Sequence, residues 1–214
     1  RPLSPNFDLY PDSSLADFSH LLDAPAGRHG FVTVSDDGHF VFSDRPGRRA
    51  RFWGVTITQE HIDIPKHRID EVVDTLARAG CNMVRFHSLD NRAGLEFGFL
   101  RRTLIDENPP HDRDTQHFDP EYLDRLDYWI ARLKERGIYA YIVLRAFRHY
   151  LEGDDVPSAD ELPRGAAQVA FFNERLIALQ EQFARDLLFE HVNPYTGLPY
   201  GQDPAVALIE LFNE

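Results

Sequence analysis

The residues best suited to acid–base chemistry stand at the end of an apolar run. Ala205-Val-Ala-Leu-Ile-Glu-Leu-Phe212 is followed directly by Asn213 and Glu214. If this run is a β-strand with Glu214 facing an interior, the two-residue period of a strand places Glu210 on the same face. Two carboxylates would then line that face, with Glu214 at the rim and Glu210 deeper.

A second polar pair interrupts the earlier apolar run Cys81-Asn-Met-Val-Arg-Phe-His87. Arg85 and His87 share one face of the expected strand. A charge within an apolar strand must be paired or functional. Glu210 is the plausible partner of Arg85, and His87 could face Glu214 at the rim. These residues alone leave open whether Arg85 serves structure or chemistry.

The elements that must position these side chains alternate from residue 51 onward. The strand runs are nearly continuously apolar, which is typical of parallel strands buried on both faces. Strands are expected at 51–58, 81–87, 138–144 and 205–212, and helices at 69–79, 120–136 and 172–187. The side chains expected to pack include Trp53, Trp129 and a stripe on the third helix of Phe172, Leu176, Leu179, Phe183 and Leu187.

Four strand–helix steps fit either an open doubly wound sheet or part of a (β/α)8 barrel. The long connections 88–118 and 147–167 favour the barrel, which builds its sites from such loops. The segment 56–61 after the first strand lacks the Gly-x-Gly-x-x-Gly pattern of dinucleotide-binding folds. We therefore predict an α/β fold with a partial (β/α)8 barrel, strands one to four, over residues 51–214. Residues 1–50 form an irregular lead-in and a β-hairpin whose strands, 31–34 and 39–42, flank an Asp-Gly turn.

The composition excludes several classes of function. Lys+Arg number 23 against 35 Asp+Glu, a net charge of −12, which disfavours nucleic acid and membrane partners. Lys66 and Lys134 are the only lysines, and an arginine-rich set of cations favours fixed ion pairs over a solvated basic patch. Cys81 is the single cysteine, and the ten histidines form no metal-binding spacing. We therefore expect no metal and no cofactor.

Six segments together resemble a known family, most specifically in the last one. They are Gly38–Phe42 leading to Arg51–Val55, Ala79–His87, Leu176–Leu188, His191–Gly197 and Asp203–Glu214. They are similar to the N-terminal half of clan A retaining glycoside hydrolases, most closely the family 5 cellulase-like proteins. The resemblance implies a (β/α)8 barrel in which Glu214 is the general acid/base. It also implies that Asn213 contacts the sugar 2-hydroxyl and that Arg85 supports the nucleophilic glutamate.

The resemblance is less complete at the substrate contacts. It implies His87 as a subsite contact. Family members often carry a histidine at the end of strand three, where this chain has Leu144-Arg145-Ala146, and His149 is the candidate replacement. In the family the nucleophile stands at the end of strand seven. Because this chain reaches strand four, no residue here is assigned that role.

The leading hypothesis is a retaining glycosidase acting on a β-linked poly- or oligosaccharide, with this chain as its N-terminal half and inactive alone. The first alternative is a non-catalytic glycan-binding or interaction fragment. The second is a metal-dependent TIM-barrel enzyme. We expect the isolated chain to self-associate through exposed barrel edges, and the family resemblance implies export from the cytoplasm.

Overall fold

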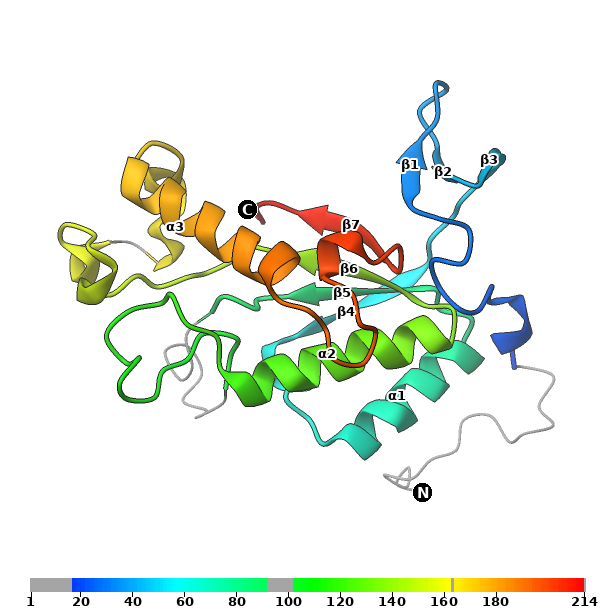
Figure 1. The fold of residues 1–214 in the computed structure, drawn as a ribbon, viewed down its shortest axis with the longest axis horizontal. Coiled ribbons are helices and arrows are strands. Elements are labelled where there is room, and N and C mark those ends of the chain that lie inside the picture. Colours follow the sequence, from blue (N-terminus) through cyan, green and yellow to red (C-terminus); the bar gives the residue numbers. More distant parts are fainter. Residues whose placement is uncertain (1–16, 92–101, 163, 214) are drawn as a thin grey trace, which may run out of the picture.

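The computed structural model describes residues 17–91, 102–162 and 164–213, which form two sheets and their covering helices (Figure 1). A three-stranded antiparallel sheet has the order β1-β2-β3, and a four-stranded parallel sheet has the order β4-β5-β6-β7. The first sheet contains β1 (Val32–Val34), β2 (Phe40–Phe42) and β3 (Arg45–Arg49). The second contains β4 (Gly54–Thr58), β5 (Met83–His87), β6 (Tyr139–Val143) and β7 (Val206–Glu210).

The parallel strands follow one another in chain order and alternate with helices α1 (Lys66–Arg78), α2 (Pro120–Glu135) and α3 (Glu174–Arg185). This is the arrangement of four successive units of a (β/α)8 barrel. The predicted fold class and hairpin are confirmed. Strand β3 was not predicted, because its sequence, Arg-Pro-Gly-Arg-Arg, has little β-propensity. Of the described strands it pairs with β2 alone, through an irregular register.

The three helices begin and end within three residues of the ranges that the sequence indicates, and one side chain is an exception to the expected packing. Asp119 caps α2 by accepting hydrogen bonds from the backbone N–H groups of Glu121 and Tyr122, both at 2.9 Å. The exception is Phe172, which was expected on the stripe of α3. It precedes the helix and is 83% exposed, because Asn173 is the cap and accepts a hydrogen bond from the N–H of Leu176.

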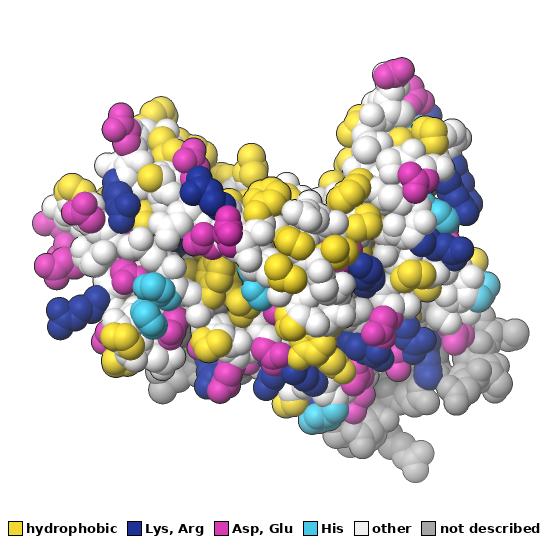
Figure 2. All heavy atoms as spheres, in the orientation of Figure 1, with side chains coloured by type: hydrophobic (Ala, Val, Ile, Leu, Met, Phe, Trp, Pro, Cys, Tyr) yellow, Lys and Arg dark blue, Asp and Glu magenta, His cyan; other side chains and the backbone are white. Residues whose placement is uncertain are grey.

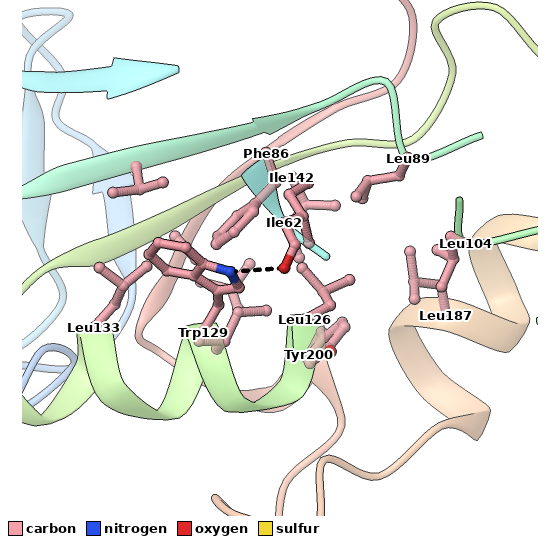
Figure 3. Packing of buried hydrophobic residues seen from close by; sticks show 14 of the residues in the cluster. Ile62, Phe86, Leu89, Leu104, Leu126, Trp129, Leu133, Ile142, Leu187 and Tyr200 are labelled. Atoms are coloured by element: carbon pink, nitrogen blue, oxygen red, sulfur yellow. Dashed lines mark hydrogen bonds between the residues drawn. The ribbon is translucent and has the colours of Figure 1, made fainter. Parts of the chain in front are cut away.

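One face of the parallel sheet packs against the helices and forms the main core (Figure 3). Trp129 of α2 is fully buried beside Phe86 of β5, and its indole N–H donates to the carbonyl of Ile62 at 3.0 Å. The expectation that Trp53 packs likewise is wrong, since its side chain is 62% exposed. Trp53 precedes β4, which has a neighbouring strand on one side only among the described residues, so less of the fold lies over it.

The antiparallel sheet closes the opposite face at the N-terminal ends of the parallel strands. Phe42 of β2 stacks on Tyr139 at the start of β6, with ring centroids 5.5 Å apart, and Phe52 meets the same ring edge-on. These rings form a second, smaller core together with Met83. The C-terminal ends of the strands lie away from this core.

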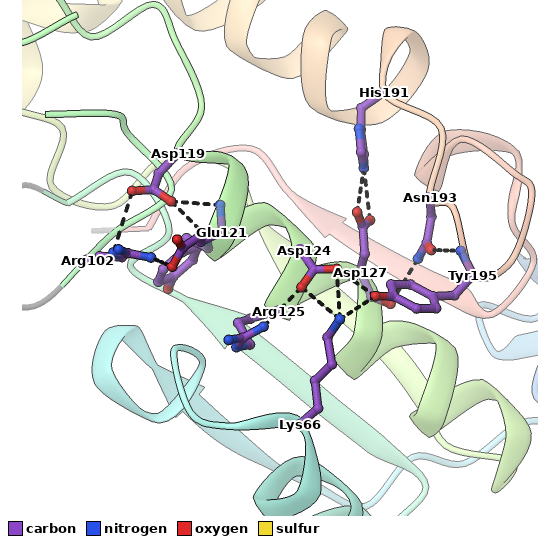
Figure 4. Close-up of polar contacts among 11 residues, drawn as sticks. Lys66, Arg102, Asp119, Glu121, Asp124, Arg125, Asp127, His191, Asn193 and Tyr195 are labelled. Carbon is purple, nitrogen blue, oxygen red and sulfur yellow. Dashed lines mark hydrogen bonds and ion pairs between the residues drawn. The ribbon is translucent and has the colours of Figure 1, made fainter. Parts of the chain in front are cut away.

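Polar contacts on α2 fix the segment that leads into β7 (Figure 4). Buried Asp127 accepts hydrogen bonds from the Tyr200 hydroxyl at 2.5 Å and stands 2.9 Å from His191 Nε2. Asn193 donates to the Asp127 carbonyl at 3.0 Å. Burial, with Asp127 beside it, raises the pKa of Tyr200 well above its ordinary value. The start of β7 is therefore held firmly on α2. No helix within the described part of the chain is long and apolar enough to cross a membrane.

Candidate active site

An ion pair joins the second and fourth parallel strands across the face turned away from the helices. Arg85 of β5 donates from Nε to Glu210 Oε2 at 3.0 Å and from Nη2 to Oε1 at 2.8 Å. Tyr141, on β6 between them, donates its hydroxyl to Glu210 Oε2 at 2.5 Å, and the Arg85 guanidinium lies 5.5 Å from its ring centre. Arg85 and Glu210 are 22% and 17% exposed, so the pair is largely shielded from water.

The electrostatics of this cluster keep Glu210 charged. Burial alone would raise the pKa of Glu210, but hydrogen bonds from Tyr141 and Arg85 outweigh it and hold the pKa below its usual range. Burial, and then the neighbouring carboxylate, raises the pKa of Tyr141. At neutral pH Glu210 is therefore an anion and Tyr141 keeps its proton. Glu210 cannot act as an acid there.

Arg85 also contacts Asn213, one of the residues that the sequence analysis singled out for the active site. Its Nη2 donates to Asn213 Oδ1 at 2.9 Å, and the Asn213 N–H donates to the carbonyl of Arg145 at 2.9 Å. Asn213 is thereby held by β5 through its side chain and by the loop after β6 through its backbone. The predicted acid/base, Glu214, lies outside the described residues.

His87 lies at the C-terminal end of β5, near this cluster. Its Nδ1 is 2.6 Å from the Ser88 hydroxyl oxygen, and its ring meets Phe147 edge-on with centroids 6.1 Å apart. Burial lowers the pKa of His87, and the positive charge of Arg85 lowers it further. The imidazole is thus neutral at pH 7. A neutral ring can donate one hydrogen bond and accept another, which suits contact with hydroxyl groups.

The sequence analysis did not predict a role for Asp90, whose carboxylate links the loop after β5 to the loop after β6. Asp90, which is 2% exposed, accepts hydrogen bonds from the N–H of Ala146 at 3.0 Å and of Phe147 at 3.2 Å. Burial raises the pKa of Asp90, and these hydrogen bonds oppose the shift. Asp90 thereby fixes the backbone directly after Arg145, whose carbonyl accepts the hydrogen bond from Asn213. The only signal in the sequence was an acidic residue just beyond a strand.

His149 lies farther along the loop after β6. It lines a small cavity together with Asp90, Asp114 and Thr115, and Arg85, Glu210 and Asn213 are not part of that lining. At the position where family members often carry histidine, Arg145 is buried with its guanidinium 4.2 Å from the ring centre of Phe212. The described residues contain no cluster of His, Cys, Asp or Glu suited to a metal ion.

Comparison with solved structures identifies the fold. A variant of a family 5 mannosidase from Rhizomucor miehei matches with a TM-score of 0.64 and 16% identity, over 86% of this chain and 49% of the mannosidase. The chain has the fold of half a family 5 glycoside hydrolase barrel. An endo-1,4-β-mannanase from the same organism matches with a TM-score of 0.59 and 16% identity, over 86% and 48% of the two chains.

A third match is an endo-β-1,4-mannanase from Thermotoga petrophila, with a TM-score of 0.52 and 24% identity over 78% of this chain and 36% of the mannanase. The chain thus spans about half the length, or less, of the structures that it matches. No family model and no curated protein sequence matches it. At sequence identities of 16% to 24%, the structural similarity establishes the fold of this chain.

Proposed function

We propose that this chain provides the acid/base half of a retaining glycoside hydrolase that acts on a β-linked glycan. The observation that carries the proposal is the hydrogen-bonded set of Arg85, Glu210 and Asn213, which ends one residue before Glu214. The set lies at the C-terminal ends of parallel strands in a half barrel of the family 5 type. Barrel enzymes build their active sites at this end.

The reaction needs two carboxyl groups about 5–5.5 Å apart. Glu214, protonated, gives its proton to the glycosidic oxygen as the bond from that oxygen to the sugar C1 breaks. The nucleophilic carboxylate bonds to C1, and we place it in the part of the barrel that these 214 residues do not include. Glu214, now ionised, then takes a proton from a water molecule whose oxygen attacks C1 and releases the nucleophile.

The described side chains would position the sugar and the incoming carboxylate. The amide of Asn213, held by Arg85 and by the loop after β6, would bond the sugar 2-hydroxyl. Arg85, fixed by Glu210, presents a permanent positive charge that favours an ionised nucleophile beside it. Neutral His87 suits an additional hydroxyl contact.

The substrate class to test first is β-1,4-linked mannan. The matched structures include two β-1,4-mannanases and a mannosidase, the latter also solved with mannosyl-fructose bound. Because the likeness in sequence is low, β-1,4-glucan belongs in the same assay. Hydrolysis of either polymer fits the proposed reaction.

The test is the activity of the full-length protein and its Glu214→Gln variant on both polymers and on an aryl β-glycoside. Removal of a general acid/base costs about 10²–10⁴-fold in rate. We expect a loss of that size on the polymers and a smaller loss on the aryl glycoside, whose leaving group needs less protonation. Glu190→Gln, an exposed change beyond the end of α3, is the control and should leave activity unchanged.

Equal activity of the Glu214→Gln variant and the wild type on mannan and glucan would contradict the proposal. Saturable binding of these glycans by full-length protein that hydrolyses none of the three substrates would favour the glycan-binding alternative instead.

A further inference from the structure

A second cavity lies at the other end of the sheet, between the hairpin and the N-terminal ends of β5 and β6. It has a volume of about 490 Å³ and is lined by four arginines: Arg45, Arg48, Arg49 and Arg51. Among the described residues, Asp23 is the one carboxylate in its lining. In Figure 2 basic side chains gather along the hairpin that projects at the right of the view. The cavity shares no lining residue with the candidate active site.

Two of the four arginines lack a partner within the part of the chain that the structure describes. Arg45 is 3.3 Å from Asp23, and Arg49 is 3.5 Å from Asp37. Arg48 and Arg51, both exposed, make no ion pair there and no side-chain hydrogen bond. The expectation that the arginines form fixed ion pairs therefore does not hold for these two, which stand beside one cavity in a chain with a net charge of −12.

The backbone that carries these arginines is fixed to both sheets. The Asn82 side chain donates to the carbonyl of Arg51 and accepts from the N–H of Trp53, both at 2.7 Å. The N–H of Ala50 donates to the carbonyl of Phe40 at 2.7 Å. The backbone that carries the guanidinium groups is therefore already fixed. A ligand would have to order only the arginine side chains.

We propose that this cavity binds a small organic anion of about sugar size that carries a carboxylate, sulfate or phosphate group. Planar guanidinium forks bind such oxyanions through paired, charge-assisted hydrogen bonds. A concave surface lined by one sign of charge also concentrates oppositely charged ligands. The proposal is independent of the reaction proposed above.

The volume of the cavity fits a sugar-sized anion better than a bare ion. Small-molecule sites typically enclose about 300–1,000 Å³, whereas a water molecule occupies about 30 Å³. Part of the lining is apolar, with Leu22, Phe42 and Tyr139 next to the arginines. A ligand with a ring and an oxyanion fits this mixture. The acidic charge of the chain as a whole disfavours a long polyanion such as nucleic acid.

The experiment is calorimetric titration of the full-length protein at constant ionic strength. The probes are glucuronate and glucose 6-phosphate, with glucose and inorganic phosphate for comparison. The test variant is Arg48→Gln/Arg51→Gln. The control, Arg113→Gln/Arg185→Gln, removes the same charge at exposed positions away from the cavity. Thermal melting of each variant then tests whether the four substitutions leave the fold intact.

We expect at least one sugar anion to bind saturably and more tightly than glucose or phosphate. Its affinity should fall at least about tenfold in the test variant and by less than about twofold in the control. Absence of saturable binding by both sugar anions, or equal losses in the two variants, would overturn the proposal. Binding of inorganic phosphate as tightly as the sugar anions would overturn the assignment to a sugar-sized ligand.

Discussion

Substitution of Glu210 by glutamine tests the geometry on which the candidate site depends. The carboxylate accepts three hydrogen bonds from Arg85 and one from Tyr141, and both charged side chains are mostly buried. Glutamine keeps nearly the same shape and one carbonyl acceptor but removes the negative charge. Arg85 would then remain in a shielded position without its counter-ion.

The size of the effect follows from this partial burial. Breaking a fully buried pair costs about 3–5 kcal/mol, while an exposed pair contributes about 0–1 kcal/mol. A hydrogen bond to a charged group contributes about 1.5–3 kcal/mol. Because the remaining carbonyl retains part of the contact, we expect Glu210→Gln to lower the free energy of unfolding by about 2 kcal/mol at pH 7.

The effect should depend on pH in a defined direction. The pKa of Glu210 in the folded protein lies below its value of 4.5 in the unfolded chain. The stabilisation is therefore complete above pH 4.5 and is lost as the pH falls through the lower, folded-state pKa. The wild type and the variant should converge in stability at acidic pH.

The assay is urea unfolding of the full-length protein, followed by circular dichroism, in a double-mutant cycle with Arg85→Gln. We expect a coupling energy of about 2 kcal/mol between Arg85 and Glu210. Glu181→Gln, on the exposed face of α3, should change stability by less than about 0.5 kcal/mol. A coupling energy below about 0.5 kcal/mol, or a difference between wild type and Glu210→Gln that is as large at pH 3 as at pH 7, would refute this reasoning.

Three further predictions concern the supports of the site. Asp119→Ala removes the cap of α2 and should lower the free energy of unfolding by about 1 kcal/mol in urea titrations. Asp90→Ala leaves the N–H groups of Ala146 and Phe147 without their acceptor, so we expect a loss of about 2–4 kcal/mol and faster hydrogen exchange at both amides. The isolated 214-residue chain is expected to self-associate, because β4 and β7 each have one paired edge among the described residues; sedimentation of a single monomeric species would contradict this.

The order of the elements could be predicted because it depends on local chemistry. Each of these features determines the structure of only the few residues around it: the apolar runs, the Asp119-Pro120 helix start and the glycines after the first two helices. The parity of the strands also placed Arg85 and Glu210 on one face. The structure joins these two side chains although 125 positions separate them in the chain.

Other features of the site depend on contacts that no local pattern contains. Tyr141 looks like an ordinary strand aromatic in the sequence, and its bond to Glu210 arises from the register of three strands. The partner of Asp90 is a backbone more than 50 residues away. The position of His149 beside a cavity lined by Asp90, Asp114 and Thr115 likewise follows from the course of a long connection.

The sequence by itself determined the succession of strands and helices and the residue types available at the ends of the strands. Hydrophobic periodicity and capping are local, so one segment is enough to read them. Only the tertiary structure decided which polar groups meet. Arg85 of β5 and Tyr141 of β6 converge on Glu210 of β7, while the arginines of residues 45–51 line a cavity at the opposite end of the sheet. Side chains become buried and paired only when the sheets assemble, and this assembly brings separate residues together into a site.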